Sequence, residues 1–307
     1  MESVRTVAVI GTGTIGASWS ALFLAHGLDV LAYDPSPDAE ARLRAFVSRA
    51  LPDVRRQEQP SRHGRLSFSS TLEAAVAAAD LVQENGPEQE EAKVALISQI
   101  EAAAPDHAIV ASSTTAFLRS RIAAGAKDPA RVIIAHPFNP PHLMPLVELV
   151  GLRPDAPAVL KAFKFYKRLG REPVILKAET VGHLANRFQA ALMREALYCL
   201  EQGVADVEDI DRAVRYGPGL RWAFMGPFQT YHLAGGGGGI RRYFRHLGPS
   251  QVKRWESLGT PDLNDALKEK AIAGVEAMLG DVTTEELETA RDSNLKAIIA
   301  ALKISGT

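Results

Sequence analysis

A histidine and a glutamate twelve residues apart carry the clearest chemical signal in this sequence. His136 follows the apolar run 132–135 and precedes three prolines within five residues, while Glu148 lies inside a second apolar run, 143–150. The first run is typical of a buried parallel strand, and the prolines fix the turn after it. A carboxylate in an apolar strand needs a partner, and we expect His136 to fill that role, with its other ring nitrogen free to take a proton. From this stretch alone, a purely structural His–Glu pair remains the alternative.

A glycine-rich stretch near the beginning of the chain predicts a dinucleotide site. An apolar strand over residues 4–10 leads into the sequence GTGTIG, and a helical pattern follows. Such a loop lets the backbone approach a pyrophosphate, whose charge is favoured at the N-terminus of a helix. A second strand, 30–33, ends eighteen residues after the last glycine in an aspartate, near the spacing of a ribose-binding carboxylate. The candidate cofactor-binding residues here are Gly11, Gly13, Thr14, Ile15, Gly16 and Asp34.

The aspartate also indicates which cofactor binds. Asp34 favours NAD over NADP, because a 2′-phosphate would meet a carboxylate and the following residues 35–37 provide no cation. FAD would use the same glycine pattern, but hydride chemistry with His136 does not require a flavin. A tight strand–helix turn without a ligand is the alternative interpretation of the loop.

The remaining segments predict an α/β fold with two domains. Short apolar strands end in polar residues at 83–88, at 112–115 and at His136, as in an open parallel sheet whose ligand lies beyond the carboxyl ends of its strands. Helical patterns follow residue 179, at about 181–202, 206–215, 262–279 and 284–302. We therefore expect a Rossmann-type dinucleotide-binding domain over residues 1–179 and an all-α domain for substrate binding and dimerisation over residues 180–307.

The composition argues against several classes of protein. The 307 residues are 46% hydrophobic and 23% charged, and the net charge of −1 provides no global field for nucleic acid or an anionic membrane. The single cysteine cannot form an internal disulfide, and we find no signal peptide and no apolar run that could span a bilayer. We predict no metal site and expect a cytoplasmic enzyme.

Two further segments each allow more than one interpretation. Arg55, Arg56, Arg62 and Arg65 surround a polar loop, where they could meet the phosphates of a large substrate or form a solvated face. The five-glycine run 235–239 does not follow a strand, so we interpret it as a mobile loop rather than as a phosphate site.

Together the motifs resemble the L-3-hydroxyacyl-CoA dehydrogenase family over nearly the whole chain. The resemblance rests on the glycine loop with Asp34, the sequence His-Pro-Phe-Asn-Pro at 136–140, the spacing to Glu148, and the pattern Gly182-x-x-x-Asn186-Arg187. It implies a Rossmann-type domain, a helical domain that forms a homodimer, and oxidation of a 3-hydroxyl to a 3-oxo group with NAD.

The resemblance also implies roles for the catalytic residues. His136 would be the general base, Glu148 its orienting carboxylate, and Asn186 a hydrogen-bond partner of the substrate oxygen or of the histidine. Thr115 takes the place of a serine of the family. Its hydroxyl is kept, but its extra methyl group could alter the placement of the substrate.

Three more residues are assigned to the cofactor in the same way. Glu88 and Lys93 match positions that contact the nicotinamide half of NAD, and Asn139 lies in the His-Pro-Phe-Asn-Pro sequence.

The substrate subgroup is suggested by residues 83–88 and 217–227, which resemble the family members that act on free 3-hydroxy acids, L-gulonate 3-dehydrogenase (similar to a lens crystallin) and carnitine 3-dehydrogenase. Arg221 is a fork-shaped donor suited to a small carboxylate, and Trp222 beside it could help to cage a trimethylammonium group. A structural ion pair for the arginine and a core position for the aromatic residue are the alternatives.

Two other functions stay open. The first is an enzyme for short-chain L-3-hydroxyacyl-CoA such as 3-hydroxybutyryl-CoA, with the arginines near 55–65 binding the CoA. The second is a non-catalytic NAD-binding, crystallin-like protein.

Overall fold

The computed structural model describes residues 4–55 and 64–302, which form two compact units. The first unit extends to Ala185 and the second covers Asn186–Leu302. The division therefore lies a few residues beyond the expected domain boundary at residue 179. Arg56 and Arg62, two of the arginines that could meet the phosphates of a large substrate, lie outside the described residues.

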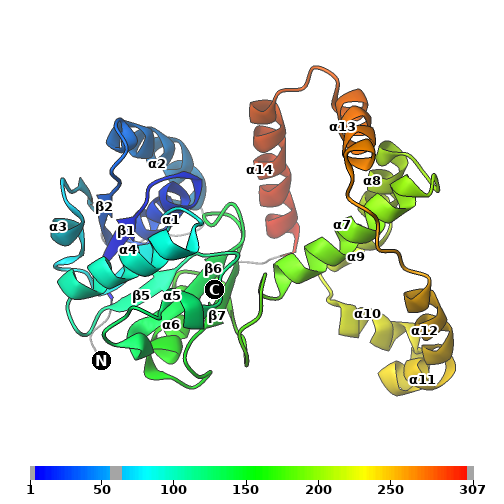
Figure 1. Cartoon of the computed structure of the whole chain (residues 1–307), viewed down its shortest axis with the longest axis horizontal. Coiled ribbons are helices and arrows are strands. Elements are labelled where there is room, and N and C mark those ends of the chain that lie inside the picture. Colours follow the sequence, from blue (N-terminus) through cyan, green and yellow to red (C-terminus); the bar gives the residue numbers. More distant parts are fainter. Residues whose placement is uncertain (1–3, 56–63, 303–307) are drawn as a thin grey trace. The chain divides into compact units, whose positions relative to one another are not determined.

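The first unit is built on one eight-stranded sheet (Figure 1) with the strand order β3-β2-β1-β4-β5-β6-β7-β8. The strands are β1 (Thr6–Ile10), β2 (Asp29–Tyr33), β3 (Leu66–Phe68), β4 (Leu81–Glu84), β5 (Ile109–Ser112), β6 (Val132–Pro137), β7 (Leu146–Val150) and β8 (Glu172–Ile175). The strand order reverses between β1 and β4, and dinucleotides bind at such a switch point in doubly wound sheets.

Two strands depart from the expected parallel arrangement, because β7 runs antiparallel to β6 and β8 runs parallel to β7. The connection of residues 138–145 explains this, since a parallel crossover needs about a dozen residues or more. The antiparallel pairing places His136 opposite Glu148.

Helices cover both faces of the sheet. On one face α1 (Thr14–Ala25), α2 (Ala39–Arg55) and α6 (Pro157–Arg168) pack on residues such as Val7 and Val9. On the other face α3 (Leu72–Val76), α4 (Glu90–Ala103) and α5 (Arg119–Ile122) contact the alternate residues, such as Ala8 and Ile10. The central strands are buried on both sides, which is why they are continuous apolar runs in the sequence.

The second unit is entirely helical. Its helices are α7 (Ala185–Glu201), α8 (Val207–Tyr216), α9 (Pro218–Trp222), α10 (Pro227–Ala234), α11 (Gly239–His246), α12 (Gly248–Glu256), α13 (Asp265–Leu279) and α14 (Thr284–Ala301). α7 begins with the last residue of the first unit. The capping box expected at Thr283 and Glu286 is present at the start of α14. None of the described helices combines the length and the apolar character needed to cross a membrane.

The segment 218–256, for which no helix was expected, forms α9 to α12. Prolines occupy the first turns of α9, α10 and α12, where a missing N–H costs nothing. The five-glycine run is also regular: Gly236–Gly238 form a 3₁₀ turn between α10 and α11. The run was interpreted as a loop, and this was wrong, because three of its glycines form a 3₁₀ helix.

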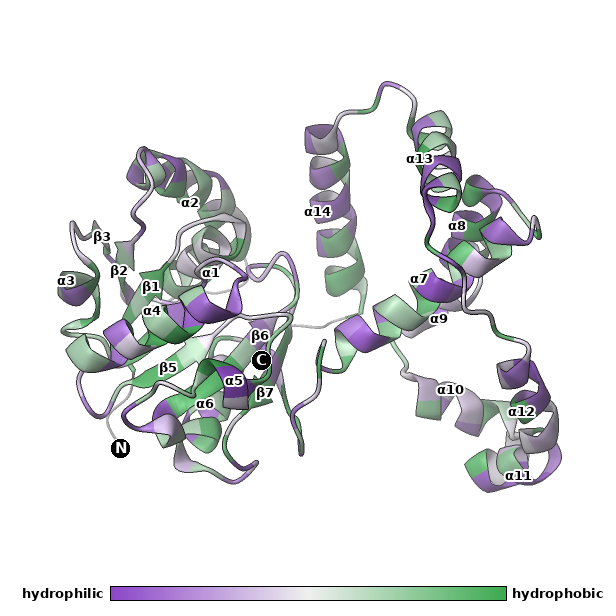
Figure 2. Ribbon diagram, viewed as in Figure 1, coloured by the Kyte–Doolittle hydropathy of each residue, from purple (hydrophilic) through white to green (hydrophobic). Residues whose placement is uncertain are grey.

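Many large apolar side chains of the second unit remain exposed. Phe188, Met193 and Phe228 are 64%, 56% and 79% exposed. Figure 2 shows hydrophobic and hydrophilic residues side by side on these helices, in contrast to the hydrophobic strand β5 of the first unit.

Candidate active site

The pairing of β6 with β7 places His136 directly opposite Glu148. His136 Nδ1 lies 2.9 Å from Glu148 Oε2, and the two side chains are only 5% and 1% exposed. Because an ionised carboxylate can only accept, Nδ1 carries the proton and donates it to Glu148. Nε2 is thus the nitrogen that can take a proton from a substrate.

The second oxygen of Glu148 is also occupied. Oε1 accepts hydrogen bonds from the backbone N–H groups of Leu184 at 2.7 Å and Ala185 at 3.1 Å. Burial would raise the pKa of Glu148, but the hydrogen bonds from His136, Leu184 and Ala185 outweigh it and hold the pKa below its ordinary value. The glutamate therefore stays ionised and can stabilise a protonated His136.

A second histidine packs against this pair. The rings of His183 and His136 lie 4.8 Å apart between centroids. His183 Nε2–H donates to the Thr114 carbonyl at 3.0 Å, whereas its Nδ1 is buried and has no hydrogen-bond partner among the described residues. Burial, followed by the charge of a protonated His136, lowers the pKa of His183 despite the bond to Thr114. His183 is thus a neutral neighbour of the base.

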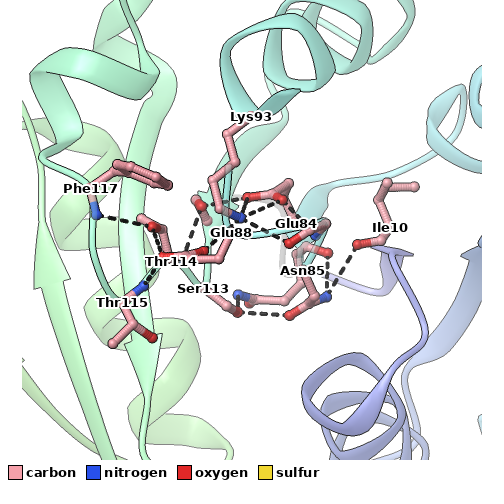
Figure 3. Close-up of polar contacts among 12 residues, drawn as sticks. Ile10, Glu84, Asn85, Glu88, Lys93, Ser113, Thr114, Thr115 and Phe117 are labelled. Carbon is pink, nitrogen blue, oxygen red and sulfur yellow. Dashed lines mark hydrogen bonds and ion pairs between the residues drawn. The ribbon is translucent and has the colours of Figure 1, made fainter. Parts of the chain in front are cut away.

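The loop after β5 is organised around Glu88, which Figure 3 shows between Lys93 and Thr114. Glu88 Oε1 accepts from the Thr114 hydroxyl at 2.5 Å and from the N–H groups of Thr115 and Ala116, each at 2.8 Å. Burial would raise the pKa of Glu88, but the bonds from this loop and the charge of Lys93 lower it. Glu88 therefore fixes the backbone of the segment that carries Thr115.

A buried ion pair lies beneath this loop. Lys93 Nζ is 3.0 Å from Glu84 Oε1, and these side chains are 1% and 0% exposed. The ammonium also contacts Gly86 O at 3.1 Å and Glu88 Oε2 at 3.3 Å. All three ammonium donors thus have protein partners. A direct contact of Lys93 with the cofactor remains a prediction.

A cavity of about 750 Å³ lies at the carboxyl edge of β1 and β2. The tips of these strands, the loops that follow them, the start of α3 and residues along α4 as far as Gln99 line it. The residues concerned include Gly11, Gly13, Asp34, Asn85 and Gly86. Its size suits one half of a dinucleotide, since ligand pockets measure about 300–1,000 Å³.

The glycine loop has the geometry that a pyrophosphate requires. Gly11 has φ +84°, and a Cβ there would lie 2.6 Å from Asn85 O. By contrast, a Cβ at Gly13, the residue before α1, would meet nothing within 4 Å. This open space at a helix N-terminus is where a phosphate can approach the backbone, so the residues present fit the predicted cofactor.

Asp34 is held in place by the loops around it. Its Oδ2 accepts from Thr12 N–H at 2.8 Å, and its Oδ1 accepts from Ser36 N–H at 2.9 Å. Partial burial would raise the pKa of Asp34, but these bonds lower it. The Thr12 hydroxyl also donates to Oδ2 at 3.2 Å. A carboxylate has about four acceptor sites, so capacity remains for a ribose hydroxyl.

The other predicted residues are not joined to this network by side-chain contacts. Thr115 and Asn139 are exposed in the loops that follow β5 and β6, and the Thr115 hydroxyl makes no hydrogen bond within the described residues. Asn186 is the first residue of the second unit. Arg221 and Trp222 are exposed on α9, and the arginine has no ion pair in the described part of the chain. Their roles remain predictions.

Four residues of the site were not singled out from the sequence: Glu84, Ser112, Thr114 and His183. Glu84 and Ser112 end β4 and β5, and Thr114 follows β5, in stretches whose polar residues were noted only as groups. His183 gave no comparable signal, because a lone histidine before a helix is more often an ordinary surface residue.

The chain matches known proteins along most of its length. Residues 6–180 match the 3-hydroxyacyl-CoA dehydrogenase NAD binding domain, and residues 182–275 match the C-terminal domain of the same family. An L-carnitine dehydrogenase of Nocardiopsis dassonvillei is 44% identical over 98% of this chain and 93% of that protein. One of Pseudomonas aeruginosa is 43% identical over 99% and 95%.

Solved structures agree with these sequence matches. The NAD-dependent 5-formyl-3-hydroxy-2-methylpyridine 4-carboxylic acid 5-dehydrogenase has a TM-score of 0.81 at 29% identity, with 98% of each chain covered. The 3-hydroxybutyryl-CoA dehydrogenase of Escherichia coli K12 has a TM-score of 0.64 at 34% identity, covering 76% of this chain and 50% of that one.

The protein is therefore a two-domain dehydrogenase with an NAD-binding first domain, and it belongs to the 3-hydroxyacyl-CoA dehydrogenase family. The resemblance that the motifs indicated is confirmed, as are the fold class and the cofactor NAD.

Proposed function

We propose that this enzyme oxidises the 3-hydroxyl of a free, short 3-hydroxy acid of the L-carnitine type rather than of a CoA thioester. The observation that carries the chemistry is the buried His136–Glu148 pair, which leaves one imidazole nitrogen free for the hydroxyl proton. The choice of substrate class is supported by relatives named L-carnitine dehydrogenase that match nearly the whole chain.

Each residue has a separate role in the proposed reaction. His136 Nε2 removes the hydroxyl proton, and the resulting imidazolium is stabilised by the Glu148 carboxylate on its other side. Bound NAD supplies the acceptor for the hydride that leaves C3. Asn186 and the Thr115 hydroxyl hold the substrate oxygen, and Arg221 with Trp222 binds the far end of the acid. Asn139 and Glu88 contact the cofactor.

We also propose a homodimer that forms through the helical unit, and a cytoplasmic location. The exposed apolar side chains of α7, α9 and α10 support the dimer, because monomers rarely expose so many large apolar groups. Light scattering at micromolar concentration tests this, and a monomer would contradict it.

The substrate is tested by a panel of L-carnitine, L-gulonate, 3-hydroxybutyrate and 3-hydroxybutyryl-CoA, with NADH absorbance as the readout. We expect the highest kcat/KM with L-carnitine. A clear preference for the CoA ester would replace the proposal with the acyl-CoA function of the family, and no turnover of any compound would favour a non-catalytic NAD-binding role.

The same assay with His136→Ala separates chemistry from binding. Loss of a general base typically lowers kcat by roughly 10²–10⁴-fold, while NAD binding followed by fluorescence should be retained. A variant with nearly normal kcat would refute the assigned base.

A further inference from the structure

The second unit contains a segment with only one sign of charge. Residues 212–255 include eight lysines and arginines and no aspartate or glutamate, although the whole chain has a net charge of −1. Three of the arginines, at positions 241, 242 and 245, lie on α11. Within the described residues, none of these three guanidinium groups has a hydrogen bond or an ion pair. Such a surface attracts anions.

A cavity of about 230 Å³ lies where α11 meets the glycine turn that precedes it. Its lining includes Gly235, Gly236, Arg242, Tyr243 and His246. Arg242 and His246, one cationic and one protonatable residue of the same helix, therefore line the same cavity as two glycines. All of these residues belong to one compact unit.

The glycine turn brings Arg242 against the cavity. A Cβ at Gly238 would lie 2.6 Å from Arg242 Cβ, so any larger residue would displace the arginine. A Cβ at Gly235 would lie 1.8 Å from Gly239 O, so the two ends of the turn could not meet. The glycine run thus permits both the tight turn and the observed position of Arg242.

Tyr243 adds an independent observation. Its side chain is 5% exposed, and its hydroxyl is buried without a hydrogen-bond partner among the described residues. Its ring packs against Tyr231 at 4.7 Å between centroids. A buried hydroxyl is destabilising unless it is bonded, and native proteins leave few in that state. Phenylalanine would fill the same space, so the hydroxyl is not explained by packing.

We propose that this cavity binds a small oxyanion, a carboxylate or phosphate group, through Arg242 and Tyr243. A guanidinium matches two oxygens of either group with parallel hydrogen bonds, and the phenol can donate to a third acceptor site. His246 can donate as well through a ring N–H. The glycine run was not expected to bind phosphate because it follows no strand, but here it precedes a helix that carries the cation.

Binding to the full-length protein tests the site without reference to turnover. Inorganic phosphate and acetate are titrated separately by calorimetry into the wild type, Arg242→Met, Tyr243→Phe and Arg241→Met. Arg241 is the matched control, because it lies on the same helix and carries the same charge but does not line the cavity. We expect saturable binding to the wild type and to Arg241→Met, weakened roughly ten- to a hundredfold in Arg242→Met.

Tyr243→Phe distinguishes a ligand site from a structural hydroxyl. Without ligand its melting temperature should equal or exceed that of the wild type, since an unbonded buried hydroxyl is removed. Its anion binding should nevertheless weaken. Binding of phosphate alone or of acetate alone identifies the group that the cavity accepts. Binding of neither, or equal weakening by Arg241→Met and Arg242→Met, overturns the proposal, and so does a normal affinity in Tyr243→Phe.

Discussion

The imidazole rings of His136 and His183 are tilted by 42° with their centroids 4.8 Å apart, yet only one of them is held by a carboxylate. Glu148 Oε2 accepts the hydrogen bond from His136 Nδ1. His183 instead donates to the carbonyl of Thr114 and is surrounded by protein. Two adjacent imidazolium groups would repel each other, so the arrangement divides the roles into one proton acceptor and one neutral neighbour.

The neutral state of His183 predicts a particular dependence of stability on pH. Its pKa in the folded protein lies below the ordinary value of 6.5, with burial as the main cause. Below that ordinary value the unfolded chain binds the proton more readily, so stability is lost as pH falls toward the folded pKa. His183→Gln keeps a donor that can reach Thr114 and removes the titration. Denaturant unfolding between about pH 5 and 7 should therefore show a weaker pH dependence in the variant. An unchanged slope would contradict the assignment.

Glu148 predicts a second, more acidic effect. Its folded pKa is depressed below 4.5, so its stabilising contribution is present above its unfolded pKa and is lost as pH falls through the folded value. Glu148→Gln should reduce the acid-induced loss of stability and also lower kcat, because the imidazolium loses its counter-charge. Acid titrations followed by circular dichroism measure the first effect, and NADH formation measures the second. A variant with normal kcat would show that the carboxylate is only structural.

The buried pair of Lys93 and Glu84 predicts a large change in stability. Lys93→Met would leave Glu84 buried without its cation, and breaking a buried pair typically costs about 3–5 kcal/mol. The exposed pair Lys167–Glu172 is a matched control. Its nitrogen–oxygen distance is 2.7 Å with side chains 44% and 51% exposed, so Lys167→Met should cost less than about 1 kcal/mol. Equal costs in urea unfolding would refute the distinction. The double variant Glu84→Gln with Lys93→Met should recover part of the loss.

Asp34 predicts the cofactor preference. Its carboxylate lies in the cavity beside the glycine loop, and no described cation contacts it. NADP would place its 2′-phosphate near this charge, so we expect a much higher kcat/KM with NAD. Asp34→Asn keeps the size and one acceptor oxygen but removes the charge, and it should reduce the preference for NAD over NADP. This preference is measured as kcat/KM with each cofactor. Equal wild-type activity with NAD and NADP would contradict the role of Asp34.

The layers of the fold could be predicted because doubly buried strands are apolar runs and because glycines and an aspartate mark the first turn. The antiparallel β7 was missed, although the short connection from β6 implied it. Helices α9 to α12 were missed because their glycines and prolines hide the helical period.

The candidate site could also be predicted only in part from the sequence. His136 and Glu148 could be paired because an isolated carboxylate in an apolar strand needs a partner. The bonds of Glu148 to Leu184 and Ala185, and the packing of His183, depend on chain segments that meet only in three dimensions. No spacing in the sequence encodes such contacts.

Arg221 carries the prediction that decides the substrate class. It is exposed near the end of α9, beside Trp222, and no described carboxylate pairs with it. A Cβ at Gly217 would lie 2.4 Å from Ala213 O, so this glycine lets α9 pack closely on α8 rather than opening the backbone to a ligand. The guanidinium itself remains available for two parallel hydrogen bonds to a carboxylate, which lysine cannot reproduce.

Both Arg221→Lys and Arg221→Met should therefore raise KM for a free 3-hydroxy acid. A hydrogen bond to a charged group is worth about 1.5–3 kcal/mol, so kcat/KM should fall roughly ten- to a hundredfold. Activity with 3-hydroxybutyryl-CoA should hardly change, because a thioester has no carboxylate at that end. Arg215→Met, on the neighbouring helix α8, is the control for a general loss of positive charge. If the control lowers kcat/KM for the acid as strongly as Arg221→Met does, the effect is one of long-range charge and the carboxylate contact is wrong. If Arg221→Met leaves the acid unaffected while the CoA ester is the better substrate, the enzyme acts on acyl-CoA.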